Sequence, residues 1–238
     1  MRILDITRDD LPRDALVLIP VGSVEQHGPH LPLGTDSLIA EHVASEVERR
    51  FPDRVLLFPV LAVGSSMEHV GFRGTTWVRF ESMIRYLLDV LESISSWNSI
   101  GVVFVNGHGG NVDALNIVVK SWNYSNDRPR ALHYYVYNPR VVNLVKRYFP
   151  SFGHADAVET SLIAAINRDL VRWDRIVDAD ISGNINVVRT RDVSSTGIVG
   201  TLRRELVRAD VGAEILNFMV NDLISQLRTY YPGIIPST

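Results

Sequence analysis

The chain has 238 residues, of which 46% are hydrophobic and 21% charged, and its formal net charge is −3. This composition is typical of a globular protein with a sizeable core, and no apolar run approaches the roughly 18–20 residues that a membrane-spanning helix needs. The absence of cysteine excludes disulfides and thiolate metal sites, and the net negative charge argues against a nucleic-acid partner. At the start of the chain, MRILDITRDD lacks the layout of a signal peptide, so we expect a cytoplasmic protein with no membrane partner.

Apolar runs bounded by turn residues alternate with segments of helical periodicity. Runs rich in β-branched or aromatic residues predict buried strands at residues 15–22, 55–64, 100–107 and 131–138. Apolar spacing near the helical period predicts helices at residues 37–50, 78–96, 111–124, 155–168 and 203–229. The alternation indicates one α/β domain with a mostly parallel sheet. The least regular stretch, 182–200, is expected to be a loop excursion near a site.

The segment PVGSVEQHGPHLPLGTD (20–36) places metal-capable side chains in a stiff turn directly after the first predicted strand. Glu25 and His27 are two residues apart, so in extended backbone they point to the same side. The glycines and prolines that follow would return Asp36 to the same place. A carboxylate with a partner on each side can hold two divalent ions roughly 3.5–4 Å apart. Taken alone, Asp36 has a simpler interpretation as a helix N-cap.

Two further motifs follow predicted strands or open a predicted helix, where ligands of α/β sheets collect. His108 lies among the glycines of NGHGGN, which is typical of a ligand that needs close backbone approach. A phosphate-binding nest is the alternative, although the dinucleotide and P-loop patterns are absent. In HADAVETS, we place His154 before the helix and Glu159 in its first turns, pointing into the cleft. The alternative for Glu159 is a purely electrostatic role at the helix N-terminus.

The motif GSSMEHVGFRGT follows the second predicted strand. Glu68 and His69 are adjacent, so they cannot both point at one ion from regular backbone. We therefore assign both residues to the wall of the substrate pocket rather than to the metal. The other predicted pocket residues are Arg73, Gly109 and Asn111.

Together, EQHGPHLPLGTD, GHGGN, HADAVETS and SSMEHVGFRGT resemble the creatininase family. Its members include creatinine amidohydrolases, an archaeal formamidopyrimidine-ribotide deformylase and a mycofactocin-precursor peptidase. The resemblance implies one domain over residues 1–238, a three-layer α/β/α sandwich, a two-metal site and a homo-oligomer, commonly a hexamer. It further implies that Glu25 and His108 hold one ion, that His27 holds the other and that Asp36 bridges them.

The chain departs from this pattern at one ligand position. Creatininase carries a carboxylate two residues after its glycine-flanked histidine, where this chain has Gly110. The second ion therefore lacks one ligand, and Glu159 is the candidate replacement, with a mononuclear or half-occupied site as the competing outcome. Imidazoles and carboxylates without sulfur suit Zn, Mn or Fe(II). We accordingly expect two divalent ions per subunit, with the occupancy of the second site left open.

These features predict metal-assisted hydrolysis of a C–N bond other than a peptide bond in a small-molecule substrate. His154 and Glu159 are the candidate catalytic residues, with His154 protonating the departing nitrogen or hydrogen-bonding the intermediate. Creatininase has a tryptophan where this chain has Pro150, which disfavours creatinine. Arg73 would suit a phosphate or carboxylate, which favours the ribotide deformylase activity. The alternative is a non-catalytic metal- or small-ligand-binding protein on the same fold.

Overall fold

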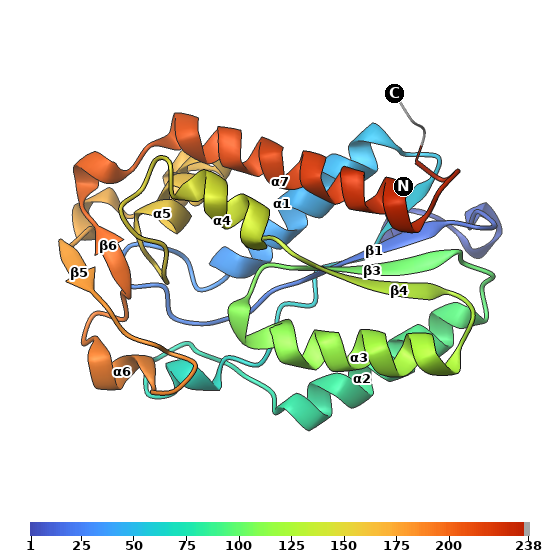
Figure 1. The fold of residues 1–238 in the computed structure, drawn as a ribbon, viewed down its shortest axis with the longest axis horizontal. Helices are drawn as coiled ribbons and strands as arrows, with labels where there is room; N and C mark the ends of the chain where they lie inside the picture. Colours follow the sequence, from blue (N-terminus) through green and yellow to red (C-terminus); the bar gives the residue numbers. More distant parts are fainter. Residues whose placement is uncertain (236–238) are drawn as a thin grey trace.

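A parallel four-stranded sheet forms the centre of the computed structural model (Figure 1), which describes residues 1–235. Its order is β2-β1-β3-β4. The strands are β1 (Leu16–Val21), β2 (Val55–Leu57), β3 (Gly101–Asn106) and β4 (Arg130–Tyr135). The register of β1 on β3 runs from Leu16 opposite Gly101 to Val21 opposite Asn106. Because the strands are parallel, the segments that follow β1 and β3 leave the sheet at the same edge.

Helices cover both faces of this sheet, so the predicted three-layer α/β/α sandwich is confirmed (Figure 1). One face carries α2 (Phe80–Ser95) and α3 (Val112–Ser125). The other carries α1 (Thr35–Arg50), α4 (Pro139–Val145), α5 (Ala157–Ile166) and α7 (Ala209–Tyr230). Along β1, Leu16 and Leu18 pack into the α1–α7 side of the core, whereas Val17 and Ile19 pack towards α2 and α3. Burial on both faces explains why β1 has a continuous apolar run.

A smaller antiparallel pair lies at one end of the molecule, beside α5 (Figure 1). It consists of β5 (Ala179–Ile181) and β6 (Gly200–Leu202), and α6 (Thr190–Val193) lies between them in the sequence. The stretch 182–200 is thus largely a loop excursion that encloses one short helix. Short 3-10 turns occupy Ile3–Asp5, Arg8–Asp10, Met67–His69, Gly109–Asn111, Arg168–Leu170, Trp173–Arg175 and Arg204–Leu206.

The predicted element boundaries differ from the structure for local reasons. The strand predicted over 55–64 ends at Leu57, because Pro59 cannot donate a ladder hydrogen bond. The last helix begins at Ala209 rather than at residue 203, since residues 204–206 form a 3-10 turn. Helix α4 was not predicted, although Asn138 caps it and Pro139 opens it, which is a recognisable start signal.

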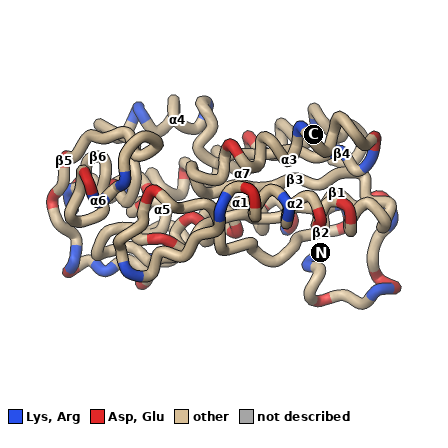
Figure 2. Tube along the Cα trace, turned by 90° about the horizontal axis from the view of Figure 1, so that it is seen from below, with Lys and Arg blue, Asp and Glu red and all other residues tan. Residues whose placement is uncertain are grey.

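Charged residues of both signs are interspersed along the chain trace (Figure 2). Among residues 1–235, no helix combines the length and the apolar character needed to cross a membrane.

Helix α5 packs closely against α7 at Gly212. A Cβ atom at this position would lie 2.1 Å from the backbone oxygen of Ser161. The Gly212→Ala change should therefore lower the free energy of unfolding by about 1–2 kcal/mol, because overpacking outweighs the gain in helix propensity. Urea unfolding would measure this loss. Asn217 is an exposed residue of the same helix, so Asn217→Ala is the control and should leave the free energy of unfolding close to that of the parent. Equal stability of the two variants would contradict the close packing.

Candidate metal centre

Buried histidines and carboxylates converge at the carboxyl edge of the sheet. Glu25 and His27 follow β1, and His108 follows β3, so the parallel strands bring these side chains together. Asp36 comes from the first turn of α1, His69 from the turn after β2, and His154 and Glu159 from the start of α5. We call the following residues the His–carboxylate cluster, and all are buried: Glu25, His27, Asp36, His69, His108, His154 and Glu159.

Asp36 lies between two imidazoles. Its Oδ1 is 3.2 Å from Nε2 of His27, and its Oδ2 is 3.0 Å from Nδ1 of His108. The same Nδ1 is 3.2 Å from Oε2 of Glu25. Each oxygen of Asp36 thus faces a different histidine, which is the arrangement of a carboxylate that bridges two ions. The bridging role itself stays a prediction.

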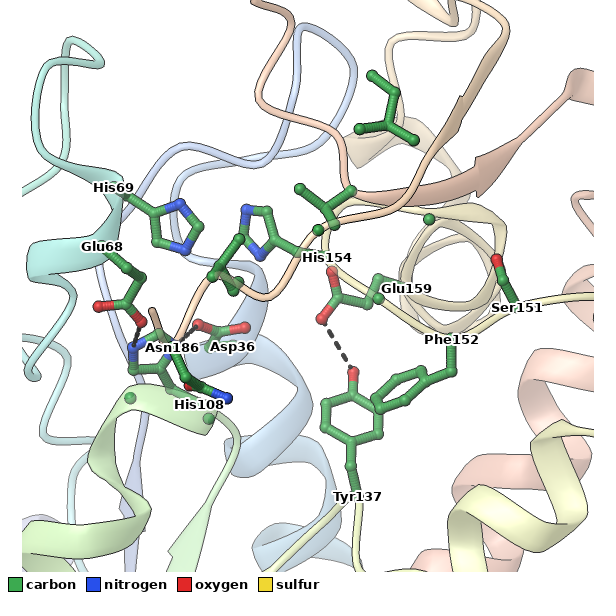
Figure 3. Close-up of a pocket in the computed structure, with 18 of the residues that line it drawn as sticks. Asp36, Glu68, His69, His108, Tyr137, Ser151, Phe152, His154, Glu159 and Asn186 are labelled. Carbon is green, nitrogen blue, oxygen red and sulfur yellow. Dashed lines mark hydrogen bonds and ion pairs between the residues drawn. The ribbon is translucent and has the colours of Figure 1, made fainter. Parts of the chain in front are cut away.

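Glu159 completes the side of the cluster next to His27. Its Oε2 is 3.7 Å from Nε2 of His27 and accepts a hydrogen bond of 2.6 Å from the backbone N–H of Ala155. The hydroxyl of Tyr137 donates to Oε1 at 3.4 Å (Figure 3). His154 approaches from the same segment, with Nδ1 3.7 Å from Oε1 of Glu25. The carboxylate that we predicted as a replacement ligand therefore lies beside His27, and its role as a ligand stays a prediction.

A tight turn before α5 holds His154 and Glu159 in these positions. Asp156 caps the helix by accepting hydrogen bonds from the N–H groups of Val158 and Glu159. The backbone of His154 pairs with that of Val199 through two hydrogen bonds of 2.6 and 2.9 Å. Because α5 begins after this turn, His154 lies on the preceding loop and Glu159 in the first turn of the helix. Asp156 thus caps the helix, while the carboxylate of Glu159 faces His27.

Opposite charges in the cluster shift its pKa values strongly. Burial lowers the pKa of His27, but the charges of Asp36, Glu159 and Glu25 together raise it to about 10. Burial likewise opposes ionisation of Asp36, yet the neighbouring imidazoles of His27 and His108 hold the pKa of that carboxyl well below its usual range. Protons on the imidazoles thus balance the carboxylate charge when no cation is present. A divalent cation supplies the same balance.

The residues of the cluster fit a divalent-metal centre. Among residues 1–235, both carboxylate oxygens of Glu25 and Oδ2 of Asp36 are buried without a hydrogen-bond partner. An unsatisfied buried polar atom costs about 1–3 kcal/mol, so these atoms call for a ligand. Three sets of possible ligand atoms lie within 4.8 Å of one another, namely Glu25–His27–Asp36, His27–His154–Glu159 and Glu25–His69–His154. Imidazole nitrogens and carboxylate oxygens suit Zn, Mn or Fe(II).

The cluster opens into a cavity of about 660 Å³. Of the predicted pocket residues, Glu68, His69 and Gly109 line this cavity, but Arg73 and Asn111 do not. Arg73 lies beside a separate cavity, which it shares with Phe72 and Thr196. Asn111 is buried below the site, where its side chain accepts from the N–H of Ser65 and donates to the carbonyl of Gly22, at 2.8 and 3.0 Å. Its role is to hold the backbone under the cluster.

Glu68 occupies the space beside Gly110. Its Oε1 is 3.3 Å from Nε2 of His108 (Figure 3). A Cβ atom at position 110 would lie 2.6 Å from this oxygen, 2.5 Å from Nε2 of His108 and 2.2 Å from the backbone oxygen of Ser65. A carboxylate thus approaches His108 from another loop at the place where position 110 has no room for a side chain.

Sequence reasoning missed Gln26 and Thr190, which contact the cluster, as well as Tyr137, which donates to Glu159. Gln26 lies between Glu25 and His27. In extended backbone its side chain would point to the side opposite theirs, so the alternation that selected its neighbours excluded it. Its amide nitrogen lies 3.0 Å from Nδ1 of His69 and 2.8 Å from Nε2 of His154. Thr190 contacts His69 from 121 residues away, and no local signal indicates that contact.

Comparison with known proteins identifies the family. The creatininase family model, described as creatinine amidohydrolase, matches residues 3–227. The chain belongs to the creatininase family. Its sequence is 35% identical over 228 residues to the mycofactocin precursor peptide peptidase of Mycolicibacterium smegmatis. The matched region covers 91% of this chain and 86% of that protein. It is 41% identical over 96 residues to the 2-amino-5-formylamino-6-ribosylaminopyrimidin-4(3H)-one 5'-monophosphate deformylase of Methanothermobacter thermautotrophicus, over 40% of each chain.

Solved creatininases share the fold of this chain. A tryptophan-to-phenylalanine mutant of creatininase superposes with a TM-score of 0.81 at 21% identity, covering 97% of this chain and 98% of the mutant. Other solved creatininases are described as a Zn-Zn form and a Mn form. Metal binding and hydrolysis are thus properties of the family, whose members differ in the bond that they cleave.

The contact between Glu68 and Gly110 gives a test of the metal centre. In Gly110→Ala, the new Cβ must displace Glu68 or the backbone oxygen of Ser65 and so disturb His108. We expect the affinity of the metal-free protein for Zn²⁺ or Mn²⁺ to fall about 10- to 100-fold in a calorimetric titration. This is the range for substitutions of residues that orient a metal ligand. Gly109→Ala is the control, because its Cβ would approach only the hydroxyl of Tyr135, at 3.3 Å. Equal affinities in the two variants would show that position 110 is not coupled to the ligands.

Proposed function

We propose that this protein is a metal-dependent hydrolase that cleaves an amide C–N bond in a peptide or peptide-like substrate. The observation that carries the proposal is a buried His–carboxylate cluster that opens into a cavity without any lysine or arginine among its described lining residues. Two divalent cations would offset the charges of the neighbouring carboxylates, which belong to Glu25, Asp36, Glu68 and Glu159. A neutral carbonyl substrate suits the remaining space.

The charge of the cavity bears on the choice of substrate. The preference for a ribotide rested on Arg73 as a partner for phosphate, but Arg73 lies beside a different cavity. Recognition of phosphate relies on cations and backbone N–H groups. The described lining supplies acidic Glu68, Glu159 and Asp180 instead. The 35% identity to a peptidase over most of the chain adds support for a peptide amide over a ribotide formamide.

The shape of the site supports an extended substrate. A second cavity of about 800 Å³ adjoins the first, and the two share Glu68, Gly109, Gly110, Tyr135, Ile185 and Asn186 among their lining residues. Its remaining wall includes apolar Met67, Phe80 and Val187 together with Asp113 and Arg189, and the guanidinium of Arg189 is paired with Asp192 at 2.8 Å. A chain that crosses the cluster would therefore have space on both sides of the scissile bond. A small ring such as creatinine needs only one of these spaces.

In the proposed mechanism, Glu25 and His108 would hold one ion, His27 and Glu159 would hold the other, and Asp36 would contribute to both. Divalent ions at these positions would act as Lewis acids and lower the pKa of bound water. His154 is placed for proton transfer, because its Nε2–H donates to the backbone carbonyl of Gln26 at 2.8 Å and leaves Nδ1 facing the cluster. We infer that Nδ1 accepts a proton from the attacking water and delivers it to the departing nitrogen.

A substrate panel tests the proposed activity. The metal-loaded protein would be incubated with short peptides that carry apolar residues, with a formylaminopyrimidine ribotide and with creatinine, and the products followed by mass spectrometry. We expect new peptide termini and neither formate nor creatine. Release of formate would favour the deformylase instead. Full metal content with no product from any C–N substrate would favour a binding protein without turnover.

Variants of Asp36 and His154 separate metal binding from proton transfer. Asp36→Asn removes the central charge, so both metal content and activity should be lost. His154→Gln should retain the parental metal content while kcat falls about 10²- to 10⁴-fold, the range for loss of a general acid–base. Elemental analysis and steady-state kinetics would measure the two properties. Metal loss in His154→Gln would mean that this histidine is a ligand rather than a proton carrier.

A further inference from the structure

Two polar side chains contact the ring nitrogen of His69 that points away from the carboxylates of the cluster. The ring is buried. The amide nitrogen of Gln26 lies 3.0 Å from Nδ1, and the hydroxyl of Thr190 lies 2.9 Å from the same atom. The contact with the amide decides which ring nitrogen carries the proton, because a hydroxyl can donate or accept whereas an amide nitrogen only donates.

The orientation of the Gln26 amide is fixed by backbone groups whose hydrogen-bonding roles cannot change. Oε1 of Gln26 accepts from the N–H of Gly28 at 3.0 Å, and Nε2 donates to the carbonyl of Gly197 at 2.9 Å. An amide nitrogen can only donate. Nδ1 of His69 is therefore the acceptor of its hydrogen bond and carries no proton. The ring then bears its proton on Nε2.

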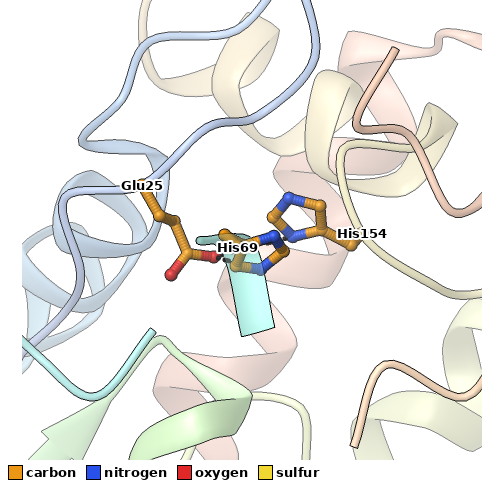
Figure 4. A group of neighbouring side chains, drawn as sticks. All are labelled: Glu25, His69 and His154. Carbon is orange, nitrogen blue, oxygen red and sulfur yellow. Dashed lines mark ion pairs between the residues drawn. The ribbon is translucent and has the colours of Figure 1, made fainter. Parts of the chain in front are cut away.

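The protonated nitrogen points into the cluster. Nε2 of His69 lies 3.1 Å from Oε1 of Glu25 (Figure 4). Within residues 1–235, neither atom has a hydrogen-bond partner, so at this distance the donor and the acceptor are each available to the other. A ring nitrogen that bears a hydrogen has no lone pair for a metal ion. The Glu25–His69–His154 set is therefore not a three-ligand site while Gln26 holds its present orientation.

The neighbouring ring of His154 has the opposite arrangement. The ring centroids of His69 and His154 are 4.1 Å apart. Nε2 of His154 lies 2.8 Å from the backbone carbonyl of Gln26 and 2.8 Å from its amide nitrogen. The carbonyl can only accept, so Nε2 of His154 bears a hydrogen, donates it to the carbonyl and takes none from the amide. The two amide hydrogens are therefore left for Gly197 and His69. Its Nδ1 keeps a lone pair that faces the cluster, whereas His69 presents an N–H.

We propose that His69 is a positioning residue for Glu25 and not a metal ligand. Its Nε2–H donates to Oε1 of Glu25, which leaves Oε2 directed towards His108, 3.2 Å away, and available to an ion. Hydrogen bonds to a ligating carboxylate orient it and adjust its affinity for metal. This inference rests on the metal centre of the proposed function and adds a role that none of its ligands supplies.

Thr190 extends this role to the 182–200 excursion. The residue is buried at the start of α6, and the hydrogen bond to Gly197 comes from the same excursion. Both supports of the His69 tautomer therefore depend on the excursion lying against the turn that carries Glu68 and His69. The excursion is a structural part of the metal centre, although it provides none of the proposed ligands.

Two substitutions at His69 distinguish a donor from a ligand. His69→Gln retains an N–H donor, whereas His69→Leu removes it. Metal-free protein would be titrated with Zn²⁺ alone, with thermal unfolding as the check on folding. We expect both variants to bind as many ions at saturation as the parent, with an affinity within about 3-fold of the parent for His69→Gln and about 10- to 100-fold weaker for His69→Leu. One ion fewer in His69→Gln, or parental affinity in His69→Leu, would overturn the proposal.

Substitutions at Thr190 test the support from the excursion without changing the cluster. Thr190→Val should weaken metal binding, whereas Thr190→Ser, which keeps the hydroxyl, should bind as the parent does. In Co²⁺-substituted protein, His69→Gln should keep the parental visible spectrum, because the ligand set is unchanged. A changed spectrum would overturn the positioning role, and parental affinity in Thr190→Val would overturn the role of Thr190. These measurements need no substrate, so failure of the hydrolysis assays would contradict the proposed function alone.

Discussion

The site depends on the burial of Glu25 and Asp36 next to each other at the edge of the sheet. Two adjacent carboxylates without water are strongly unfavourable unless positive charge or hydrogen bonds compensate. Imidazoles surround them in this fold: His27, His69 and His108 each lie within 3.2 Å of Asp36 or Glu25. The surrounding loops keep these charges together and away from solvent.

The central architecture was predictable because it depends on local periodicity. Buried parallel strands read as continuous apolar runs, and amphipathic helices between them follow a regular period. The elements that escaped prediction are short or stabilised by distant partners. Strands β5 and β6 are three residues each, and α6 is fixed by contacts with a turn more than a hundred residues earlier. Such elements carry little periodic signal of their own.

The candidate ligands were also predictable, since residues that follow neighbouring parallel strands must meet at one edge. That argument placed Glu25, His27 and His108 together without knowledge of distances. It could not place Arg73, because the glycines on either side of this segment adopt positive φ angles of 100° and 90° and turn the chain towards another cavity. It also could not assign proton positions on His69, which follow from the amide orientation of Gln26 and hence from tertiary structure.

The backbone pairing of His154 with Val199 has a consequence for motion. Two main-chain hydrogen bonds join the proton-carrying histidine to the base of the 182–200 excursion, while Ile185 and Asn186 of that excursion form part of the cavity wall. A fluctuation that swings the whole excursion outward must break this pairing and release the histidine. In the proposed hydrolysis, an outward swing that admits a bulky molecule would therefore have to be reversed before His154 could act.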